Sequence, residues 1–359
     1  MRYILLVLLV VSYVFSKSQN IVAYSDYQKK FFVFDDGKFR QLEFQPVLSY
    51  DIGDKCVGYV TNGNHFKVYN NRIDYDLSSM VRSYKVTDNL VSYQVGTQLY
   101  VFENGKKSLL SRYVGNYFAD DSLVAFFDTE NYFFQVYYKG KVITLEDGLL
   151  YEDISLFKVG SNIVAYIDAY NNFKIFYRGE SIELLQTLPA GVEIGRNVLA
   201  YIEPISNYLS VFYNGETTVL ENFKPKSYQA GYEKVAYITN MDDFKLFDNG
   251  EVYTISSFKP DNYKLKDEML VYEQQGQLFA FYKGNNFLVE NYIPTSYKFH
   301  KGTIVYFDQN GYLNLFRNGE RKILTYENVN DYKVLRNVVI YNEGMNTTKI
   351  YYNGKEYSE

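Results

Sequence analysis

Histidine and cysteine, the side chains that most often carry nucleophilic or metal chemistry, are scarce in this sequence. The chain has two histidines, His65 and His300, and one cysteine, Cys56. Protein zinc sites use three or four such ligands, and the two histidines fall in loops that we expect at opposite ends of the strands. Cys56 opens an apolar run at 56–59 and is typical of a small buried side chain. The sequence therefore predicts no catalytic residue, no metal site and no cofactor.

Carboxylates recur at one position, two residues after an aromatic side chain. They are Asp26, Asp128, Asp168, Glu203, Asp308 and Glu343. Side chains at equivalent places could form a ring that binds Ca²⁺ or a cationic group. The alternative is that each carboxylate accepts hydrogen bonds from the backbone of the turn that follows it, and the absence of a calcium-loop spacing favours this alternative. We keep Asp26, Asp128, Asp168 and Asp308 as candidate ligand contacts on a loop face.

Lysine occupies a second recurring position in five places. The set is Lys85, Lys158, Lys264, Lys298 and Lys333, with Asp51, Phe118, Glu193 and Gln229 at the equivalent places elsewhere. Five ammonium groups brought together on an acidic chain would hold an anionic ligand. The alternative is that they form the polar half of an alternating strand. Loop tyrosines offer another possibility, because Tyr170, Tyr151 and Tyr292 could stack on a sugar.

A tight turn returns about every 35 residues and reveals the elements that position these side chains. It is written Asp36-Gly37, Asn104-Gly105, Lys139-Gly140, Arg178-Gly179, Asn214-Gly215, Asn249-Gly250, Lys283-Gly284, Asn318-Gly319 and Asn353-Gly354, with Asn70-Asn71 filling the one gap. Such pairs favour the type I′ hairpin, whose two central residues need positive φ. An apolar run such as Val164-Ala165-Tyr166 lies about fifteen residues before each turn. Its consecutive apolar residues predict a strand covered on both faces.

Each repeat is expected to form four strands, a to d, joined as an antiparallel meander with short connections. Five of the six prolines lie in the longer link from strand d to the next strand a, namely Pro46, Pro189, Pro225, Pro260 and Pro294. There a proline costs no ladder hydrogen bond. These periodic units resemble short-blade β-propeller repeat proteins in architecture, without the signature of a functional family. The resemblance implies an all-β propeller of about ten units and places strand a, with its lysines, along an axial channel.

The first 18 residues are typical of a secretory signal peptide. Arg2 precedes an apolar run at 4–15, and small residues allow cleavage before Gln19. We expect a single domain at 19–359, with two rings divided near 146–155 as the alternative, and no membrane span after signal removal. Without Arg2 and Lys17 the formal charge goes from −5 to −7, and no basic block remains, which argues against a nucleic-acid partner.

These features favour a secreted or periplasmic, non-catalytic binding or scaffold module whose partner is an unknown protein or glycan. The alternative is a carbohydrate-active enzyme, a lyase or glycosidase, on the same fold. Catalytic propellers are expected to break the repeat with long loops, and here the repeat spacing varies by only a few residues. The regular spacing therefore favours binding over catalysis.

Overall fold

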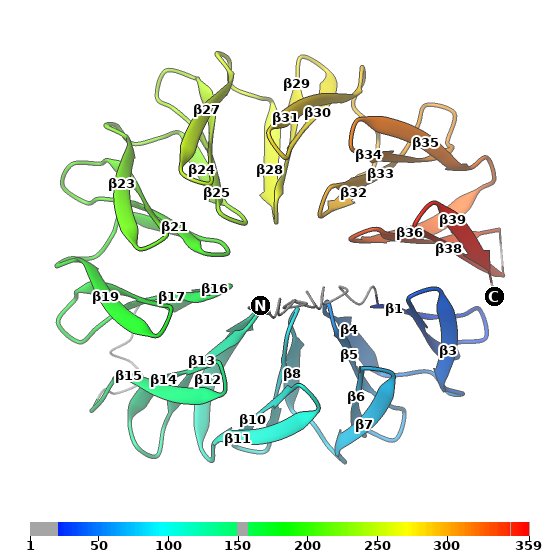
Figure 1. Cartoon of the computed structure of the whole chain (residues 1–359), viewed down its shortest axis with the longest axis horizontal. Helices are drawn as coiled ribbons and strands as arrows, with labels where there is room; N and C mark the ends of the chain where they lie inside the picture. The colour runs from blue at the N-terminus through cyan, green and yellow to red at the C-terminus, as the bar shows by residue number, and fades with distance from the viewer. Residues whose placement is uncertain (1–20, 149–156, 345, 359) are drawn as a thin grey trace, which may run out of the picture.

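The structure is a computed structural model that describes residues 21–148, 157–344 and 346–358. These ranges contain 39 strands and no helix, and the strands form ten antiparallel sheets arranged as a ring (Figure 1). Nine sheets have four strands and the first has three. The predicted all-β propeller of about ten units, built from four-stranded antiparallel meanders, is confirmed, and the first blade has three strands among the described residues. No helix in the described ranges could cross a membrane.

The inner half of each blade consists of strands a and b, and strand a lies closest to the ring axis (Figure 1). The a strands are β4 (Ser49–Ile52), β8 (Ser83–Val86), β12 (Val114–Asp120), β16 (Phe157–Gly160), β20 (Gly191–Ile194), β24 (Ser227–Ala230), β28 (Asn262–Lys266), β32 (Tyr297–His300) and β36 (Val329–Leu335). The b strands are β1 (Ile21–Ser25), β5 (Cys56–Val60), β9 (Val91–Val95), β13 (Leu123–Asp128), β17 (Ile163–Ile167), β21 (Val198–Ile202), β25 (Lys234–Ile238), β29 (Met269–Gln274), β33 (Thr303–Phe307) and β37 (Val338–Glu343).

The outer half of each blade consists of strands c and d. The c strands are β2 (Phe31–Asp35), β6 (Phe66–Asn70), β10 (Gln98–Glu103), β14 (Phe133–Tyr138), β18 (Phe173–Tyr177), β22 (Leu209–Tyr213), β26 (Phe244–Asp248), β30 (Gln277–Tyr282), β34 (Leu313–Arg317) and β38 (Thr347–Tyr352). The d strands are β3 (Lys38–Glu43), β7 (Ile73–Ser78), β11 (Lys106–Ser111), β15 (Lys141–Glu146), β19 (Glu180–Leu185), β23 (Glu216–Glu221), β27 (Glu251–Ser256), β31 (Asn285–Glu290), β35 (Glu320–Thr325) and β39 (Lys355–Ser358).

The hydrophobic core lies between neighbouring blades rather than within one sheet. In β17, Val164 and Tyr166 pack against blade 4, whereas Ile163, Ala165 and Ile167 pack against blade 6. Alternate side chains thus point to opposite neighbours, and every position of the strand is buried. This explains why strand b is apolar at consecutive positions. The contacts with blade 4 also join the sheets on either side of 149–156.

The c to d hairpins have the expected backbone. At Asn249 and Gly250 the φ angles are 51° and 96°, as a type I′ turn requires. In blade 2 the prediction was wrong by one residue, because the turn residues are Asn71 and Arg72 rather than Asn70 and Asn71. Strand β6 extends through Asn70, which pairs with Ile73.

Ring closure joins the first and last blades without a shared strand. Blade 1 lacks strand a among the described residues, so its β1 is followed only by β2 and β3. Phe34 of blade 1 meets Tyr352 and Tyr357 of blade 10 edge to face, at 5.7 and 5.2 Å between ring centroids. The opposite side of blade 1 packs on blade 2 through Phe31 and Tyr59. The predicted signal peptide, 1–18, lies outside the described residues.

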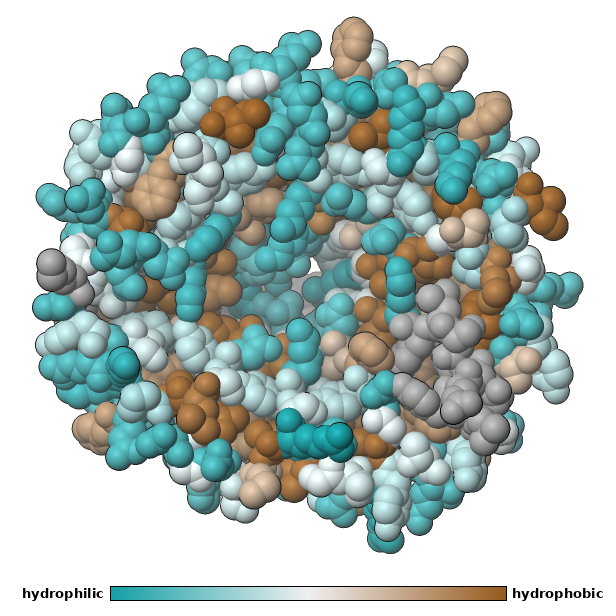
Figure 2. Space-filling model, turned by 180° about the vertical axis from the view of Figure 1, so that it is seen from behind, coloured by the Kyte–Doolittle hydropathy of each residue, from teal (hydrophilic) through white to brown (hydrophobic). Residues whose placement is uncertain are grey.

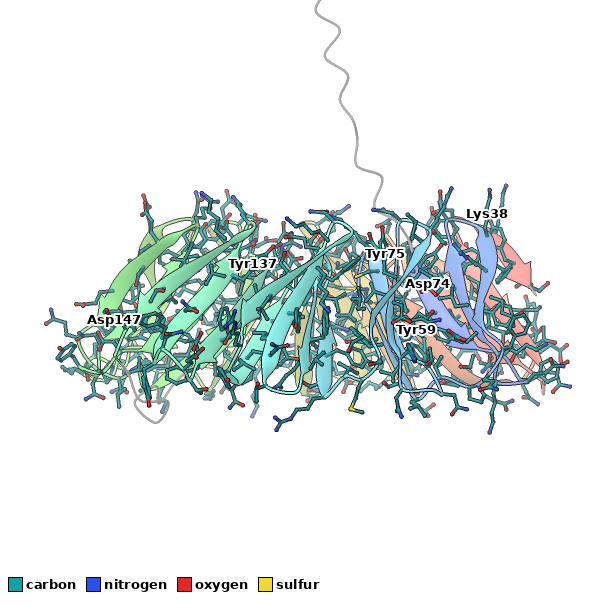
Figure 3. All side chains as sticks on the ribbon, turned by 90° about the horizontal axis from the view of Figure 1, so that it is seen from below. Lys38, Tyr59, Asp74, Tyr75, Tyr137 and Asp147 are labelled. Carbon is teal, nitrogen blue, oxygen red and sulfur yellow. The ribbon has the colours of Figure 1, made fainter. Side chains whose placement is uncertain are left out.

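The meander gives the ring two different faces. The a to b and c to d turns emerge on one face, here called the turn face, and the b to c loops and d to a linkers emerge on the other, here called the linker face. In the side view, Lys38, just after a c to d turn, lies at one edge, and Asp147, in a d to a linker, lies at the opposite edge (Figure 3). Loops of these two classes can therefore be treated as separate surfaces.

Candidate functional site

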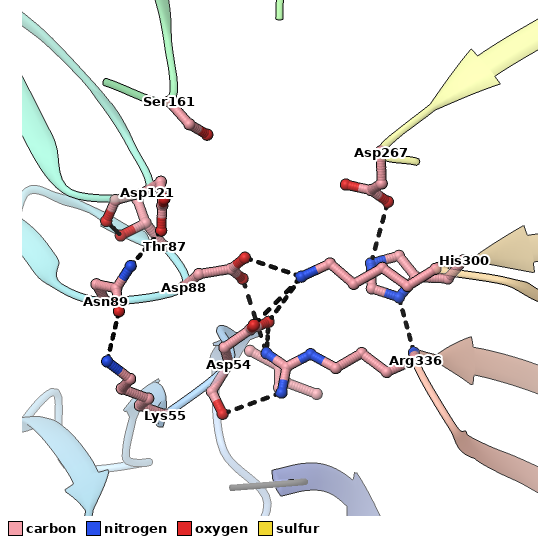
Figure 4. A network of polar contacts seen from close by, with 12 residues as sticks. Asp54, Lys55, Thr87, Asp88, Asn89, Asp121, Ser161, Asp267, His300 and Arg336 are labelled. Atoms are coloured by element: carbon pink, nitrogen blue, oxygen red, sulfur yellow. Dashed lines mark hydrogen bonds and ion pairs between the residues drawn. The ribbon is translucent and has the colours of Figure 1, made fainter. Parts of the chain in front are cut away.

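The a to b turns meet around the axis on the turn face, and one residue at the equivalent position of each turn carries most of the charge there. These residues are Asp54, Asp88, Asp121, Ser161, Arg196, Tyr232, Asp267, Lys301 and Arg336. Because strand a is the innermost strand of each blade, a short side chain here reaches the neighbouring blade, and a long one reaches across the axis. The turns therefore build a polar network that no single repeat contains (Figure 4).

Two long cations reach from blades 9 and 10 past blade 1, which has no inner strand among the described residues. The Lys301 ammonium lies 3.2 and 3.3 Å from the Asp54 carboxylate oxygens and 3.0 Å from Asp88. The Arg336 guanidinium pairs with the Asp54 carboxylate and donates to the Asp54 carbonyl oxygen at 3.3 Å. Burial lowers the pKa of Arg336 to about 10, so the guanidinium stays charged at pH 7. We call these four residues the closure cluster, since they link blades 9 and 10 to blades 2 and 3.

His300 holds the backbone that carries Arg336. Its Nδ1 accepts the N–H of Arg336 at 2.7 Å, and its Nε2 lies 3.5 Å from an Asp267 carboxylate oxygen. An accepting Nδ1 cannot carry a proton, so the Nε2 nitrogen is protonated. Burial lowers the pKa of His300 to about 4, although Asp267 acts in the opposite direction. The imidazole is therefore neutral at pH 7, and it positions Arg336, a member of the closure cluster.

Asparagines at the second turn position link neighbouring blades. Asn162 donates to Asn197 at 3.1 Å, and Asn197 donates to Glu233 at 2.9 Å. The blades approach very closely beside these turns. A Cβ on Gly195 would lie 1.9 Å from the Gly231 carbonyl oxygen, so only glycine fits there. The recurring glycine and asparagine next to the a to b turn are thus parts of the contact between blades.

A cavity of about 360 Å³ lies on the turn face beside the closure cluster. Its walls include Lys85 and Asp120 on one side of the ring and Lys266 and Glu268 on the opposite side. Partial burial and the neighbouring Asp121 raise the pKa of Asp120 to about 6. Asp88 borders this cavity and also a smaller one of about 50 Å³ under Arg336. The ion pairs of the closure cluster thus separate the main cavity from the gap at blade 1.

Two of the five strand-a lysines bind the inner strand of the next blade, and a third, Lys333, binds blade 2. Lys158 donates to the carbonyl oxygen of Val192 at 2.6 Å, and Lys298 donates to that of Tyr332, also at 2.6 Å. An inner edge strand leaves such carbonyl groups without a ladder partner, so the lysines satisfy them. For Lys333 the described part of blade 1 offers no adjacent inner strand.

Lys333 instead reaches strand a of blade 2 and donates to the Tyr50 hydroxyl at 2.7 Å. Within the described ranges, Lys85 and Lys264 have no polar partner, and only Lys85 borders the cavity. Strand alternation predicted that the five lysines are polar. It did not indicate that the partners of Lys158, Lys298 and Lys333 lie on other blades.

The carboxylates that follow strand b turn back onto their own loops. Oδ1 of Asp168 accepts the backbone N–H groups of residues 170 and 172, and Oδ1 of Asp308 accepts those of residues 310 and 312, all at 2.9 Å. Asp128 likewise accepts from residues 130 and 131, and Asp26 from residue 30. This is the turn-stabilising arrangement. The described residues contain no group of three or more His, Cys, Asp or Glu placed to hold a metal ion.

Exposed apolar side chains distinguish the linker face from the turn face. In the d to a linkers they are Phe44, Leu48, Met80, Tyr113, Leu188, Phe223, Phe258, Ile293 and Tyr326, and in the b to c loops they are Tyr27, Tyr132, Tyr170, Ile205 and Met241. Ile205 is 91% exposed, and Phe258 is 68% exposed. Among the described residues, no a to b or c to d turn carries an exposed large hydrophobic side chain.

Hydrophobic residues are spaced around the linker face, which is the view in Figure 2. The sequence carries a signal for them that the strand analysis missed. An apolar residue stands two positions before the linker proline in Phe44, Phe223 and Phe258. Tyr170, predicted as a loop contact, belongs to this set and is 84% exposed. Tyr292 lies in a linker next to Ile293, and Tyr151 lies outside the described residues.

The ring of ten antiparallel sheets around a charged axis defines a ten-bladed propeller. The chain belongs to the ten-bladed β-propeller domain family, whose model matches residues 15–357. No curated protein matches the chain.

Solved structures similar to this chain include a designed protein, a plant receptor ectodomain and a yeast protein. The computationally designed Ika8 protein is 13% identical, with 93% of this chain and 99% of that chain covered and a TM-score of 0.37. The CRINKLY WD40 ectodomain of the receptor kinase ACR4 from Arabidopsis thaliana is 6% identical, with coverages of 67% and 95% and a TM-score of 0.34. Hsv2 from Kluyveromyces lactis is 11% identical, with coverages of 78% and 99% and a TM-score of 0.34. At these TM-scores the likenesses carry no functional argument.

Proposed function

We propose that this chain is an exported, non-catalytic scaffold that binds a partner protein on its linker face. The observation that supports this function is the one-sided distribution of exposed apolar side chains. Outside the strands, all fourteen exposed large hydrophobic side chains lie in linker-face loops and the described turn-face turns have none, while nine more lie on strands. Water-exposed apolar surface on a single face is typical of an interaction site.

The chemistry of the linker face suits a protein more than an anionic membrane. Phe44, Phe223 and Phe258 provide aromatic anchors of the kind that dominate protein interfaces. A chain with a formal charge of −5 would be repelled by an anionic lipid surface. The short loops also favour binding over catalysis, since no loop among the described residues is long enough to form a separate active-site lid.

Export is supported by the pattern of residues 1–18, a basic start followed by an apolar run and small residues before Gln19. A single cysteine, Cys56, fits a secreted or periplasmic chain that relies on packing rather than on disulfides. Mass spectrometry of the protein recovered from outside the cytoplasm tests this part. A mature N-terminus at Gln19 is expected, and an intact Met1 in the cytoplasm would contradict export.

Site-specific photocrosslinking tests the proposed face in cells that produce the chain. A photoreactive residue replaces Phe258 or Tyr170 on the linker face, and matched probes replace Asn214 or Lys283 in c to d turns. We expect one discrete protein adduct from the linker-face probes and none from the turn-face probes. Equal labelling from both faces, or linker-face adducts with lipid or with a second copy only, would refute a protein partner on this face. Binding of a glycan array by the unmodified protein would favour the carbohydrate alternative.

A further inference from the structure

The turn-face cavity has unpaired charges of both signs on opposite walls. Lys85 is on blade 3 and Glu268 is on blade 8, and β8 and β28 lie on opposite sides of the ring (Figure 1). Neither side chain has a polar partner within the described ranges. The other charges of the cavity are largely engaged, because Asp88 pairs with Lys301, and Arg196 lies 3.4 Å from Asp121. An uncompensated ammonium therefore faces an uncompensated carboxylate across an open space.

Two further charged side chains, Lys266 and Asp120, give each wall of the cavity one positive and one negative charge. Lys266 stands beside Glu268 without a polar partner, and Asp120 accepts one hydrogen bond, from Ser161 at 3.4 Å. An anion in the cavity would meet Asp120 and Glu268, and a simple cation would meet Lys85 and Lys266. Neither kind of ion is favoured by lining of mixed sign. A ligand that carries one charge of each sign at its two ends fits this pattern.

The lining gives little support for a sugar. Tyr232 is the aromatic residue in the wall, and the Arg196 guanidinium lies over its ring, 4.7 Å from the centroid. A sugar would need an open aromatic face on which to stack. The cavity therefore lacks the platform that carbohydrate binding would use.

The size of the cavity limits the length of the ligand. A sphere of about 360 Å³ is roughly 9 Å across, and an extended peptide spans about 3.3–3.6 Å for each residue. Two or three residues therefore reach from one wall to the other. The volume is also at the lower end of the usual range for small-molecule pockets, about 300–1,000 Å³.

We propose that the turn-face cavity binds the free zwitterionic form of a dipeptide or tripeptide, with its carboxylate at Lys85 and its ammonium group at Glu268. Asp120 is the weaker partner for the ammonium group, because it lies on the same wall as Lys85 and accepts a hydrogen bond from Ser161. Lys85 and Glu268 thus set the orientation. This site lies on the face opposite to the proposed protein-binding surface, so either proposal can fail alone.

Isothermal titration calorimetry of the purified protein with trialanine at pH 7 tests the site. Blocking the ligand at one end separates the two contacts, so N-acetyl-trialanine and trialanine amide are titrated as well. We expect each blocked peptide to bind at least tenfold more weakly than trialanine. Equal affinity for blocked and free peptides, or no heat with trialanine up to 10 mM, would overturn the proposal, and so would tighter binding of a dicarboxylate such as succinate.

Matched variants show which residue binds the carboxylate of the peptide and which binds its ammonium group. Lys85→Met should weaken trialanine binding about tenfold and remove the penalty for amidation, and Glu268→Gln should remove the penalty for acetylation. Lys264→Met, at the equivalent strand position but outside the cavity wall, is the control and should bind as the unchanged protein does. Far-UV circular dichroism confirms that each variant is folded. A folded Lys85→Met protein that keeps the full amidation penalty would refute the assigned orientation.

Discussion

Arg336→Met should destabilise the ring by about 2–3 kcal/mol, because this arginine holds blade 10 to blade 2 at the place where blade 1 has no inner strand among the described residues. Only 13% of its side chain is exposed, and its guanidinium contacts the carboxylate and the carbonyl oxygen of Asp54. Breaking a buried ion pair typically costs about 3–5 kcal/mol, since one charge is left without a partner. The expected cost is smaller here, because Asp54 is 26% exposed and keeps its contact with Lys301.

Arg321→Met is the control, because it removes the same charge from a more exposed arginine whose buried partner, Glu290, keeps the hydrogen bond from the Tyr306 hydroxyl. Arg321 lies 3.2 Å from Glu290 and is 45% exposed, so its loss should cost less than about 1 kcal/mol. Urea unfolding at pH 7, followed by far-UV circular dichroism, gives the two midpoints for comparison at equal m-value. The difference should persist in 0.5 M salt, because buried charges are poorly screened. If Arg336→Met costs no more than Arg321→Met, the closure cluster does not hold the ring together.

Two further predictions concern the same axial region. Since burial lowers the pKa of His300 to about 4 from 6.5, its stabilising contribution is complete above pH 6.5 and is lost as the pH falls toward 4. The stability advantage of the unchanged protein over His300→Gln should therefore shrink by up to about 3 kcal/mol between pH 6.5 and 4, and an advantage that urea midpoints show to be independent of pH would contradict this pKa. Gly195→Ala should cost more than about 2 kcal/mol, because its Cβ would lie 1.9 Å from a carbonyl oxygen of the next blade. Gly250→Ala, where the nearest atom is 3.8 Å away but φ is +96°, should cost only about 1 kcal/mol, and thermal unfolding with equal losses for the two variants would argue against the close approach of the blades.

The repeating part of the fold could be predicted because every repeat carries the same two sequence signals, one for strand b and one for the c to d hairpin. Strand b is apolar at consecutive positions, as in Val164 to Tyr166, and the hairpin pair such as Asn249-Gly250 fixes the next turn. Both signals depend on local backbone and burial, which a sequence pattern records directly. Blade 2 departed from the prediction because Arg72, without the usual glycine, takes the positive φ.

The candidate sites could not be predicted, because they depend on contacts between blades that do not recur from repeat to repeat. Arg336 and Asp54 are 282 positions apart, and they meet across blade 1, whose described residues include no inner strand. No periodic signal reports such a contact. Strand alternation placed Lys158 and Lys298 on the polar side, but their binding to the neighbouring blade required the curvature of the ring. The apolar linker residues were visible in the sequence, yet their gathering on one face follows from the direction of the meander.

The binding affinity of the crosslinked partner protein tests the central claim most directly. Biolayer interferometry compares the unchanged chain with a Phe223→Ser, Phe258→Ser double variant, and the control is Val219→Ser, Leu288→Ser, which removes exposed apolar residues from the outer d strands. Each aromatic anchor at an interface is worth about 2 kcal/mol or more, so the double linker variant should bind at least 100-fold more weakly. The control variant should stay within threefold of the unchanged chain. Equal loss in both variants, or no loss in the linker variant, would contradict a binding surface on the linker face.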